Sequence, residues 1–424
     1  MHMSRIDSMR ADEPDSRQLA RVAFRATFGV FVLSGFLFAS WVSRIPTVRT
    51  DLDVGPATIG TILLVGSLGS VVALPLAGAV VMRLGTARTV VAATCVAGAG
   101  FAALAGSVAL GNLVLMAASL AFASVGIAGW DVAMNLEGAM VERGLGRAVM
   151  PMFHAGFSLG TVAGAGVGAL AAHLGVSPSW HVVAAVVAVV ALVTVAVRRF
   201  LAETGGTPDV SAATDPSAAA VPAPPRRHPF AAWAEPRTLL IGLLVLSAAL
   251  TEGAANDWLG LAGIEAFDLT DSGGALMLAA FLAAMTAMRF LGTGLLDRFG
   301  RVVVLRLCIA LALTGLTLFS LAPTVPLGVV GVVLWGLGAA LGFPVGMSAA
   351  SDDPLHAAAR VSVVSSIGYT AFLAGPPLLG LLAEHVGYRN ALLVILLPLA
   401  VSLLVTRVAA PPADARPAGV QDAT

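Results

Sequence analysis

Two carboxylates and one guanidinium lie inside long apolar stretches of this 424-residue chain. Asp131 and Glu252 are each followed four residues later by an asparagine, Asn135 and Asn256, which in a helix lies one turn away on the same face. A charged side chain at the centre of a bilayer costs roughly 2.5–3.5 kcal/mol on insertion scales, so each acid needs a chemical reason to be there. Taking up a proton on one side of a membrane and releasing it on the other is such a reason. We therefore assign proton coupling to Asp131 and Glu252, with a hydrogen-bonded structural role as the alternative.

Arg289 is the one basic residue that lies well inside an apolar segment. Because an arginine does not lose its charge in proteins, Arg289 requires a carboxylate, a cavity or both, and among the carboxylates Glu252 is the first candidate and Asp131 the second. The result could be a permanent internal salt bridge or a clamp for an anionic substrate group. His154 could relay protons near neutral pH, or could simply pack near the membrane surface. The residues that we expect to bind substrate are Trp130, Asn135, His154, Asn256 and Arg289.

The elements that position these residues are long apolar segments. Hydrophobic residues make up 58% of the chain and charged residues 11%, which excludes an ordinary soluble globular protein. A helix needs about 20 apolar residues to span a bilayer. This criterion selects residues 23–43, 57–82, 88–109, 112–138, 149–172, 180–198, 238–259, 274–296, 304–322, 326–348, 361–383 and 390–409. The sequence therefore predicts an all-α membrane protein with twelve transmembrane helices in two pseudo-symmetric six-helix halves.

Composition divides the chain into five parts. A polar tail (residues 1–20) precedes the N-terminal half (21–198), and the C-terminal half (238–409) precedes a second tail (410–424). Residues 199–237 lie between the halves and are rich in Ala, Pro, Thr, Ser and Asp. Such a composition is typical of a flexible linker.

The positions of the arginines predict the orientation in the membrane. Of the 24 basic residues, Arg289 lies within a span, and Arg44, Arg49 and Arg389 fall on connections at one side. The other 20 fall on the tails, the linker and the connections at the opposite side, and an excess of positive residues marks the cytoplasmic side. We therefore expect a multi-pass protein of the cell (inner or plasma) membrane with both termini and the linker in the cytoplasm.

The two halves repeat each other in sequence. MRLG at residues 82–85 and DRFG at residues 297–300 both follow the second span of their half. GALAAHLG at residues 168–175 matches GLLAEHVG at residues 380–387. The offsets are 297 − 82 = 215 and 380 − 168 = 212, so the two matches are consistent to within three residues. Parallel six-span repeats about an axis along the membrane normal are found in major facilitator transporters.

The stretch GTGLLDRFGR at residues 292–301 resembles the loop motif of the major facilitator superfamily, Gly-x-Leu-x-Asp-Arg-x-Gly-Arg. The first-half copy, GAVVMRLGTAR at residues 78–88, has Met82 in place of the aspartate and Thr86 in place of an arginine. The resemblance implies a cytoplasmic charge network that gates alternating access. The residues to which it assigns this gating role are Asp297, Arg298 and Arg301, and in part Arg83 and Arg88.

Within the superfamily the chain is similar to fucose/proton symporters and to related, uncharacterised bacterial permeases. The likeness rests on WVSRIP (residues 41–46), WDVAMN (130–135), HAGFSLG (154–160) and EGAANDW (252–258). The fucose symporters carry an acidic residue in the fourth span followed four residues later by Asn, a spacing that WDVAMN reproduces. They also carry an acidic residue in the first span, where this chain has none.

These features predict a secondary transporter of a small polar, sugar-like solute, coupled to protons and working by alternating access. Proton-driven efflux of a drug or metabolite and a non-transporting membrane sensor are the alternatives. The sequence contains no nucleotide-binding loop, metal-ligand cluster or nucleophile elbow. We therefore expect no enzyme activity, no metal and no cofactor other than a proton gradient. The expected partners are the solute, protons and the lipid bilayer, with no nucleic acid, and the chain is expected to be a monomer.

Overall fold

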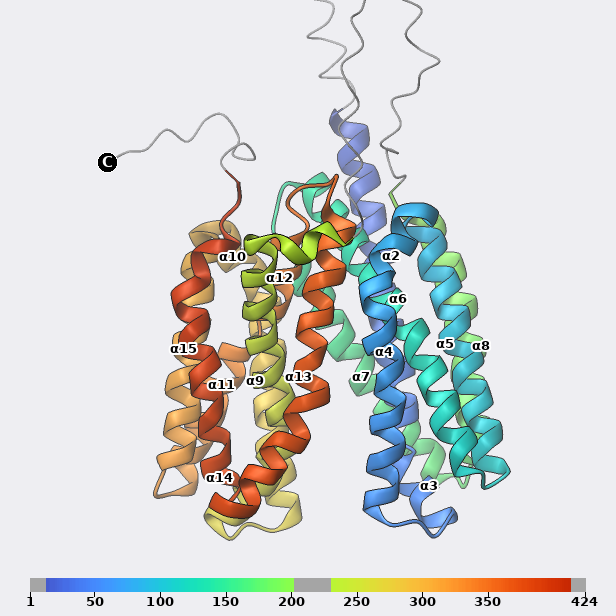
Figure 1. The fold of residues 1–424 in the computed structure, drawn as a ribbon, viewed down its shortest axis with the longest axis vertical. Helices are drawn as coiled ribbons and strands as arrows, with labels where there is room; N and C mark the ends of the chain where they lie inside the picture. Colours follow the sequence, from blue (N-terminus) through green and yellow to red (C-terminus); the bar gives the residue numbers. More distant parts are fainter. Residues whose placement is uncertain (1–12, 202–229, 413–424) are drawn as a thin grey trace, which may run out of the picture.

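The computed structural model describes residues 13–201 and 230–412, and every regular element in them is helical (Figure 1). Helices are expected because hydrocarbon offers the backbone no hydrogen-bond partners, so each spanning segment must satisfy its own polar groups. The N-terminal half consists of α2 (Glu13–Val42), α3 (Ile45–Asp51), α4 (Pro56–Leu84), α5 (Thr86–Ala109), α6 (Leu113–Leu145), α7 (Met150–His173), α8 (Pro178–Ala196) and the 3-10 helix η1 (Val197–Arg199).

The C-terminal half begins with the 3-10 helix η2 (Ala231–Ala234). Its remaining elements are α9 (Pro236–Phe267), α10 (Asp271–Leu321), α11 (Val325–Ala339), α12 (Gly342–Ala350), α13 (Ala357–Val386), α14 (Tyr388–Ala391), η3 (Leu392–Ile395), α15 (Leu396–Val405) and η4 (Thr406–Ala409).

Helix α10 contains two spans that meet at Gly300. Its 51 residues are interrupted there by non-helical backbone angles, φ 76° and ψ 163°. Within the described residues, 11 continuous helical stretches are long and apolar enough to cross a membrane. Because one of these stretches is the interrupted α10, the number of spans is twelve. The predicted all-α fold with twelve transmembrane helices is confirmed.

The sequence repeat has matching turns in the backbone. Gly85, between α4 and α5, has φ 81° and ψ 165°, close to the angles of Gly300. Gly175, before α8, has φ 70°, and Gly387, before α14, has φ 81°. Glycine adopts positive φ angles without the steric cost that other residues incur. These four glycines therefore end helices at equivalent places in the two halves.

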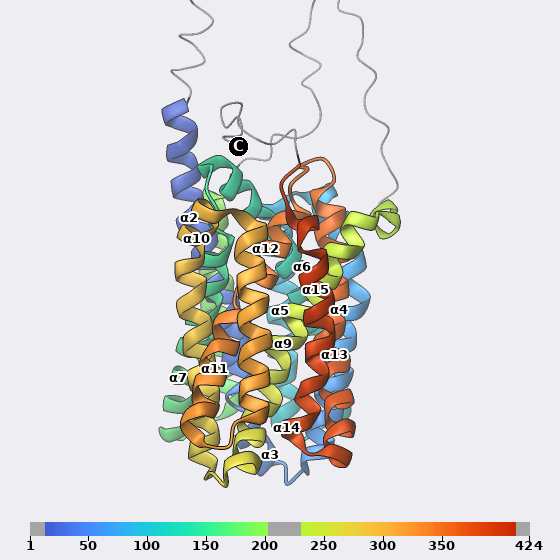
Figure 2. The same cartoon turned by 90° about the vertical axis from the view of Figure 1, so that its left-hand side faces the viewer.

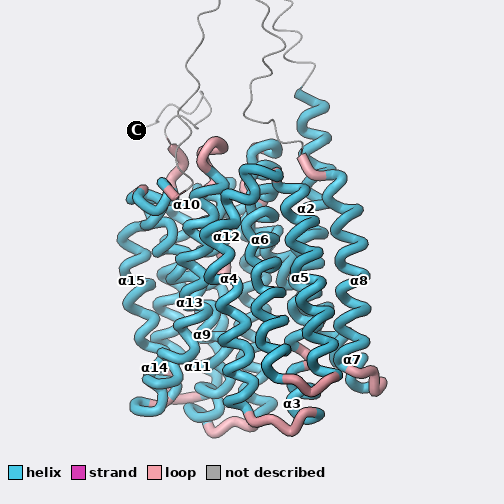
Figure 3. Tube along the Cα trace, turned by 45° about the vertical axis from the view of Figure 1, so that its right-hand side comes forward, coloured by secondary structure: helices cyan, strands magenta, loops and turns pink. Residues whose placement is uncertain are grey.

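The two halves stand side by side with their helices aligned (Figures 1 and 2). At one end of the bundle α2 begins, α8 ends, α9 begins and the chain leaves α15; we call this the linker end. The short helices α3 and α14 lie at the opposite end, which we call the far end (Figure 3). Each half therefore starts and finishes at the linker end, as an even number of spans requires.

The boundaries of the predicted tail and linker shift in the structure. Helix α2 begins at Glu13 rather than after residue 20, and η1 and η2 lie at the two ends of the predicted linker, residues 199–237. Polar residues can extend a helix beyond the apolar stretch by which it was predicted, so these ends were not visible in the hydropathy. Residues 1–12, 202–229 and 413–424 of the predicted tails and linker lie outside the described residues.

Glycines allow the closest helix contacts. On α7, Gly160 lies so close to the backbone carbonyl of Val32 on α2 that a Cβ atom would not fit. Between the halves, Gly78 of α4 approaches the backbone carbonyl of Ala358 on α13 in the same way. Small residues permit such approaches in lipid, where helices associate through packing rather than through a hydrophobic force. The contact at Gly78 holds the two halves together near the linker end.

Candidate functional site

Asp131 lies at the contact between the two halves, among neutral hydrogen-bond partners. Asn135, one turn along α6, donates from Nδ2 to Asp131 Oδ1 at 3.2 Å. Ser365 of α13, in the other half, donates from Oγ to Asp131 Oδ2 at 3.5 Å. Asp131 is 7% exposed and Asn135 is fully buried. At ~1.5 Å per residue, Asp131 lies roughly 16 Å from Glu142 near the linker end of α6, which places it near mid-depth.

His154 of α7 connects this cluster to both halves. Its Nε2 lies 3.2 Å from Asn135 Oδ1. Its imidazole packs edge-on against Phe31 of α2 and Phe343 of α12, with ring centroids 5.3 and 5.4 Å away. Its backbone carbonyl accepts a hydrogen bond from Ser158 Oγ at 3.2 Å. The ring is therefore buried between aromatic side chains of the N-terminal and C-terminal halves.

Arg289 of α10 makes three hydrogen bonds to three different parts of the chain. Its Nη2 donates to Glu252 Oε2 of α9 at 2.9 Å, which is an ion pair. Its Nη1 donates to Ser158 Oγ of α7, in the N-terminal half, at 2.8 Å. Its Nε donates to the carbonyl of Ala340, between α11 and α12, at 3.3 Å. The Arg289 side chain is only 4% exposed, so the expected pairing of this cation with Glu252 is present in a nearly dry environment.

The Asp131 cluster and the Arg289 pair are one connected system. Ser158 accepts from Arg289 and donates to the carbonyl of His154, whose ring contacts Asn135, the neighbour of Asp131. Hydrogen bonds therefore lead from a carboxylate of the N-terminal half to Glu252, a carboxylate of the C-terminal half. This arrangement supplies donors, acceptors and aromatic faces at the contact between the halves, and it lies far from either membrane surface.

Two residues that we expected at the site lie apart from this system. Asn256 is exposed, although it is one turn from Glu252. Trp130 is 2% exposed, and its indole N–H has no hydrogen-bond partner among the described residues. One helical turn places two residues on the same face, but it does not decide whether both reach the same neighbours. The substrate-binding role of these two residues is not supported by a contact with the cluster.

Asp297 and Arg301, expected at the gate, both contact the other half at the linker end. Asp297 Oδ1 accepts from the backbone N–H of Ala148 at 2.8 Å, and its Oδ2 lies 3.6 Å from Arg147 Nε. Arg301 Nη2 lies 3.5 Å from Glu142 Oε1 of α6. These contacts join the residues on both sides of the Gly300 kink in α10 to the end of α6 and to the connection between α6 and α7.

Arg301 is also the centre of a network that the sequence-based prediction did not include. Its Nη1 donates to Asp352 Oδ1 at 2.6 Å and its Nη2 to Ser348 Oγ at 2.6 Å. Ser348 in turn donates to Glu142 of the other half. The acidic residues that complete the network are Glu142 and Asp352. Both lie close to the end of an apolar segment, and this position in the sequence is the signal by which they could have been found. Their separation along the chain does not show that both contact Arg301.

The remaining predicted gate residues do not reach the contact between the halves. Arg298 is exposed and lies over the ring of its neighbour Phe299, with Cζ 5.2 Å from the centroid. Arg83 and Arg88 are exposed, and within the described residues neither takes part in a hydrogen bond or an ion pair. Of the five residues predicted for the gate, Asp297 and Arg301 contact the other half, and Arg298, Arg83 and Arg88 do not.

No metal site accompanies these clusters. In the part of the chain that the structure describes, no group of three or more His, Cys, Asp or Glu side chains is placed to hold a metal ion. Cys95 and Cys308 are both free thiols.

Comparison with known proteins agrees with the fold. The chain is 31% identical over 367 residues to an uncharacterised transporter, y4wD, of Sinorhizobium fredii, covering 86% of this chain and 92% of that protein. The structure is similar to that of the Escherichia coli fucose:proton symporter, with a TM-score of 0.73, 15% identity and coverage of 91% and 98%. A structure of the fucose transporter in the outward conformation gives a TM-score of 0.76, with 15% identity and coverage of 92% and 99%.

The profile of the Major Facilitator Superfamily matches residues 26–351 and 241–424, which together include nearly the whole chain. The matched part contains both six-helix halves, the loop motif at Asp297–Arg301 and the hydrogen-bonded system at mid-depth. The protein therefore belongs to the Major Facilitator Superfamily of membrane transporters.

Proposed function

We propose that the protein couples the transport of a small, polar, sugar-like solute to the movement of protons. The observation that carries this proposal is the hydrogen-bonded system between the halves, in which Arg289 bonds to Glu252 in its own half and to Ser158 in the other. Halves that separate during alternating access must break such contacts. A solute and a proton that bind at the same contact can therefore control the separation.

Asp131 rather than Glu252 carries the proton in this proposal. Protonation of Glu252 would leave Arg289 as a buried cation without a counter-charge, and stranding one partner of a buried ion pair costs roughly 3–5 kcal/mol. Protonation of Asp131 strands no cation, because Asn135 and Ser365 are neutral. We therefore assign Glu252 to charge compensation of Arg289 and Asp131 to proton uptake and release.

The same charges favour a neutral solute. The positive charge of Arg289 is already matched by Glu252 at 2.9 Å, so an anionic substrate group would have to displace a carboxylate. Hydroxyl groups of a sugar can use the donors and acceptors of Asn135, His154 and Ser158 without such an exchange. The likeness to a fucose:proton symporter supports this substrate class.

We place the linker end in the cytoplasm, because 20 of the 24 basic residues fall on that side. The contacts at Gly78, Glu142, Asp297 and Arg301 then close the cytoplasmic side of the path. This state corresponds to an outward-facing transporter, and the opposite state requires these contacts to break.

Helix α12 connects the site with this closed side. Arg289 holds the carbonyl of Ala340 just before α12, and Ser348 near the other end of α12 bonds to both Arg301 and Glu142. A nine-residue helix thus has the ion pair at one end and the gate at the other. A change at Arg289 can move the gate through α12, and this is the coupling step that we propose.

The test is solute-driven proton movement in proteoliposomes. We expect Asp131→Asn to retain exchange of a labelled sugar and to lose its accumulation against a gradient, because the amide binds solute but cannot release a proton. Asp257→Asn is the matched control, since it also neutralises a carboxylate on a spanning helix but lies outside the cluster, and it should accumulate the sugar normally. Uphill accumulation by Asp131→Asn would refute the assignment. Proton-linked movement of a drug out of the vesicles, with none of a sugar, would favour efflux.

A further inference from the structure

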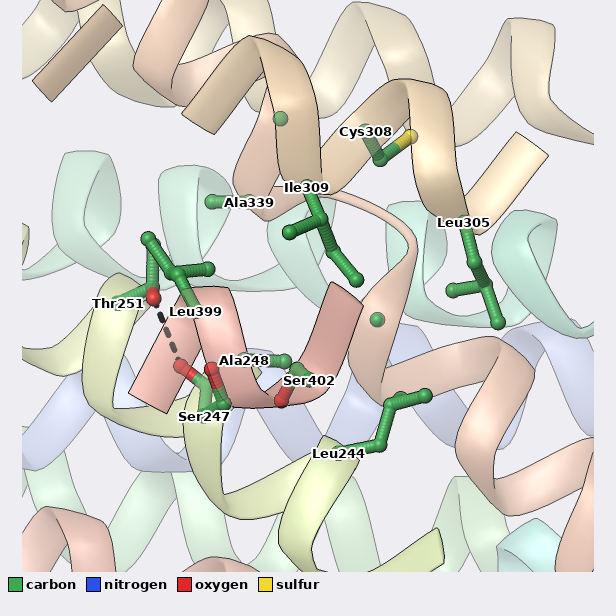
Figure 4. A pocket seen from close by; sticks show the side chains of 12 residues that line it. Leu244, Ser247, Ala248, Thr251, Leu305, Cys308, Ile309, Ala339, Leu399 and Ser402 are labelled. Atoms are coloured by element: carbon green, nitrogen blue, oxygen red, sulfur yellow. Dashed lines mark hydrogen bonds between the residues drawn. The ribbon is translucent and has the colours of Figure 1, made fainter. Parts of the chain in front are cut away.

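A small cavity lies inside the C-terminal half, away from the contact between the halves (Figure 4). Its volume is about 20 Å³. Its polar lining consists of Ser247 and Thr251 on α9, Cys308 on the second span of α10, and Ser402 on α15. The rest of the lining is apolar, and the cavity contains no ionisable carboxylate or basic group.

Two hydroxyl groups at this cavity lack partners among the described residues. Ser247 and Ser402 are each 1% exposed, and neither Oγ has a hydrogen-bond partner. A hydroxyl in a helix can satisfy itself by donating to the carbonyl four residues earlier, as Thr251 does to Ser247 at 2.7 Å. Ser247 and Ser402 do not do this, and both side chains line the cavity in Figure 4. Buried polar groups are almost always hydrogen-bonded, and these two hydroxyls line a cavity that leaves room for a partner that is not protein.

We infer that this cavity is a binding site for one water molecule, held by Ser247 and Ser402. A space of about 10–15 Å³ for a water-sized probe is enough for one water, and an empty cavity of this size would be expected to have an apolar lining. A calcium or magnesium ion is a poor fit, because these ions take six or more oxygen ligands, carboxylates among them, and the cavity is lined by no carboxylate. The water ties α9 to α15 five residues before Glu252 on α9. This inference does not depend on the proposed substrate or on proton coupling.

The sign of a stability change tests the water site. If the water is present, Ser247→Ala and Ser402→Ala each remove one of its partners, and we expect each to lower the melting temperature of the purified protein by roughly 2 °C. The melting temperature of the double variant should then fall by less than the sum of the two single decreases, because the first change already weakens the binding of the water. If the cavity is dry, each alanine removes a buried unpaired hydroxyl, and stability should stay constant or rise.

Ser320→Ala is the matched control. Ser320 is also buried at 4% exposure with an unpartnered Oγ, but it does not line the cavity. We expect this change to leave the melting temperature unchanged or to raise it. If Ser247→Ala and Ser402→Ala change the melting temperature in the same way as Ser320→Ala, the inference is wrong.

X-ray hydroxyl-radical footprinting gives a second test that does not rely on stability. Radicals form from bound water, so Cys308, which is 1% exposed but lines the cavity, should be oxidised in the wild type. Ser402→Val fills the space and should lower the oxidation rate of Cys308 severalfold. Cys95, which is exposed, serves as the internal reference and should keep its rate. No oxidation of Cys308 in the wild type, or an equal rate in Ser402→Val, would show that no water binds there.

Discussion

The two halves of the molecule hold their central carboxylates in different ways. In the N-terminal half Asp131 is bonded to the amide of Asn135 and the hydroxyl of Ser365. In the C-terminal half Glu252 is bonded to the guanidinium of Arg289. A carboxylate with neutral partners can gain a proton and leave no charge behind, whereas one paired with an arginine cannot. The comparison therefore separates a group suited to proton exchange from a group suited to holding a permanent charge.

The two copies of the loop motif differ in a related way. Gly85 and Gly300 give the two loops nearly the same backbone. In the first copy Thr86 donates to Glu137 of α6 at 2.8 Å, a contact within its own half. In the second copy Arg301 contacts Glu142 of the other half. Similar turns thus carry side chains that contact different halves, and only the second copy contributes a charged contact between the halves among the residues compared.

The largest effect is expected where a substitution leaves a buried charge without its counter-charge. Glu252→Ala should lose most of the folded, monodisperse protein, because it leaves Arg289 uncompensated at a cost of roughly 3–5 kcal/mol. The double variant Glu252→Ala with Arg289→Ala should recover folded yield, measured by size-exclusion chromatography in detergent. Asp131→Asn is the control, since it strands no cation and should fold normally. If the folded yield of the double variant falls by the sum of the two single losses, Glu252 and Arg289 do not compensate each other, and the proposed difference between Glu252 and Asp131 is wrong.

The next effect concerns the two loop copies. Arg301→Ala should lower the rate of solute counterflow by at least about tenfold, equivalent to ~1.4 kcal/mol, because Glu142 and Asp352 lose their shared cation. Arg88→Ala, in the first copy, should change the rate little, since substitutions at exposed sites usually lie within about 0.5 kcal/mol. Equal losses in both variants would show that the first copy also works as a gate.

A smaller effect is expected at Asp297. Its carboxylate accepts from Ala148 N–H just before α7 and lies near Arg147, and a charge near a helix N-terminus is worth roughly 0.3–1 kcal/mol. Asp297→Asn should therefore slow turnover severalfold at most, with KM unchanged, because it alters the balance of conformations and not the site. Met82→Asn changes the equivalent exposed position of the first copy and should have no effect. A changed KM in Asp297→Asn would place this residue in the binding site instead.

The smallest effect is a pH dependence at the linker end. Arg360 Nε donates to Glu235 Oε2 at 2.6 Å, and this hydrogen bond lowers the pKa of the Glu235 carboxyl, which lies just before α9. A lowered pKa in the folded state stabilises the protein above the unfolded pKa near 4.5, and the contribution is lost as the pH falls through the folded value. The melting temperature of the wild type should therefore drop more between pH 5 and about pH 3 than that of Glu235→Gln. Parallel curves would mean that this pair adds no stability.

Much of the fold followed from hydropathy, and the exceptions have clear causes. Twelve apolar segments were enough to predict twelve spans, because each helix must cover the hydrocarbon thickness by itself. The repeated glycines form equivalent turns in the structure, because a positive φ favours glycine in both copies. The start of α2 at Glu13 was missed, since polar residues that extend a helix leave no trace in an apolar pattern.

The candidate site was predicted in part. The pairing of Arg289 with Glu252 could be expected, because a buried arginine needs a carboxylate and few were available at that depth. Ser158 could not be identified in this way, since a neutral hydroxyl at mid-depth carries no such requirement. Asn256 was expected beside Glu252, but it is exposed, because helical spacing says which face a residue shares and not what that face meets.

By itself, the sequence determined the class of protein, the number of spans, the repeat and the need to neutralise each buried charge. These properties follow from the cost of placing backbone and charge in hydrocarbon, which depends on composition and on distance along one helix. Only the tertiary structure decided that Ser158 joins Arg289 to the other half, that Arg301 gathers Glu142 and Asp352, and that Arg88 does not take part. Contacts between the halves depend on how separate helices are rotated and shifted against each other, and no spacing along the chain contains that information.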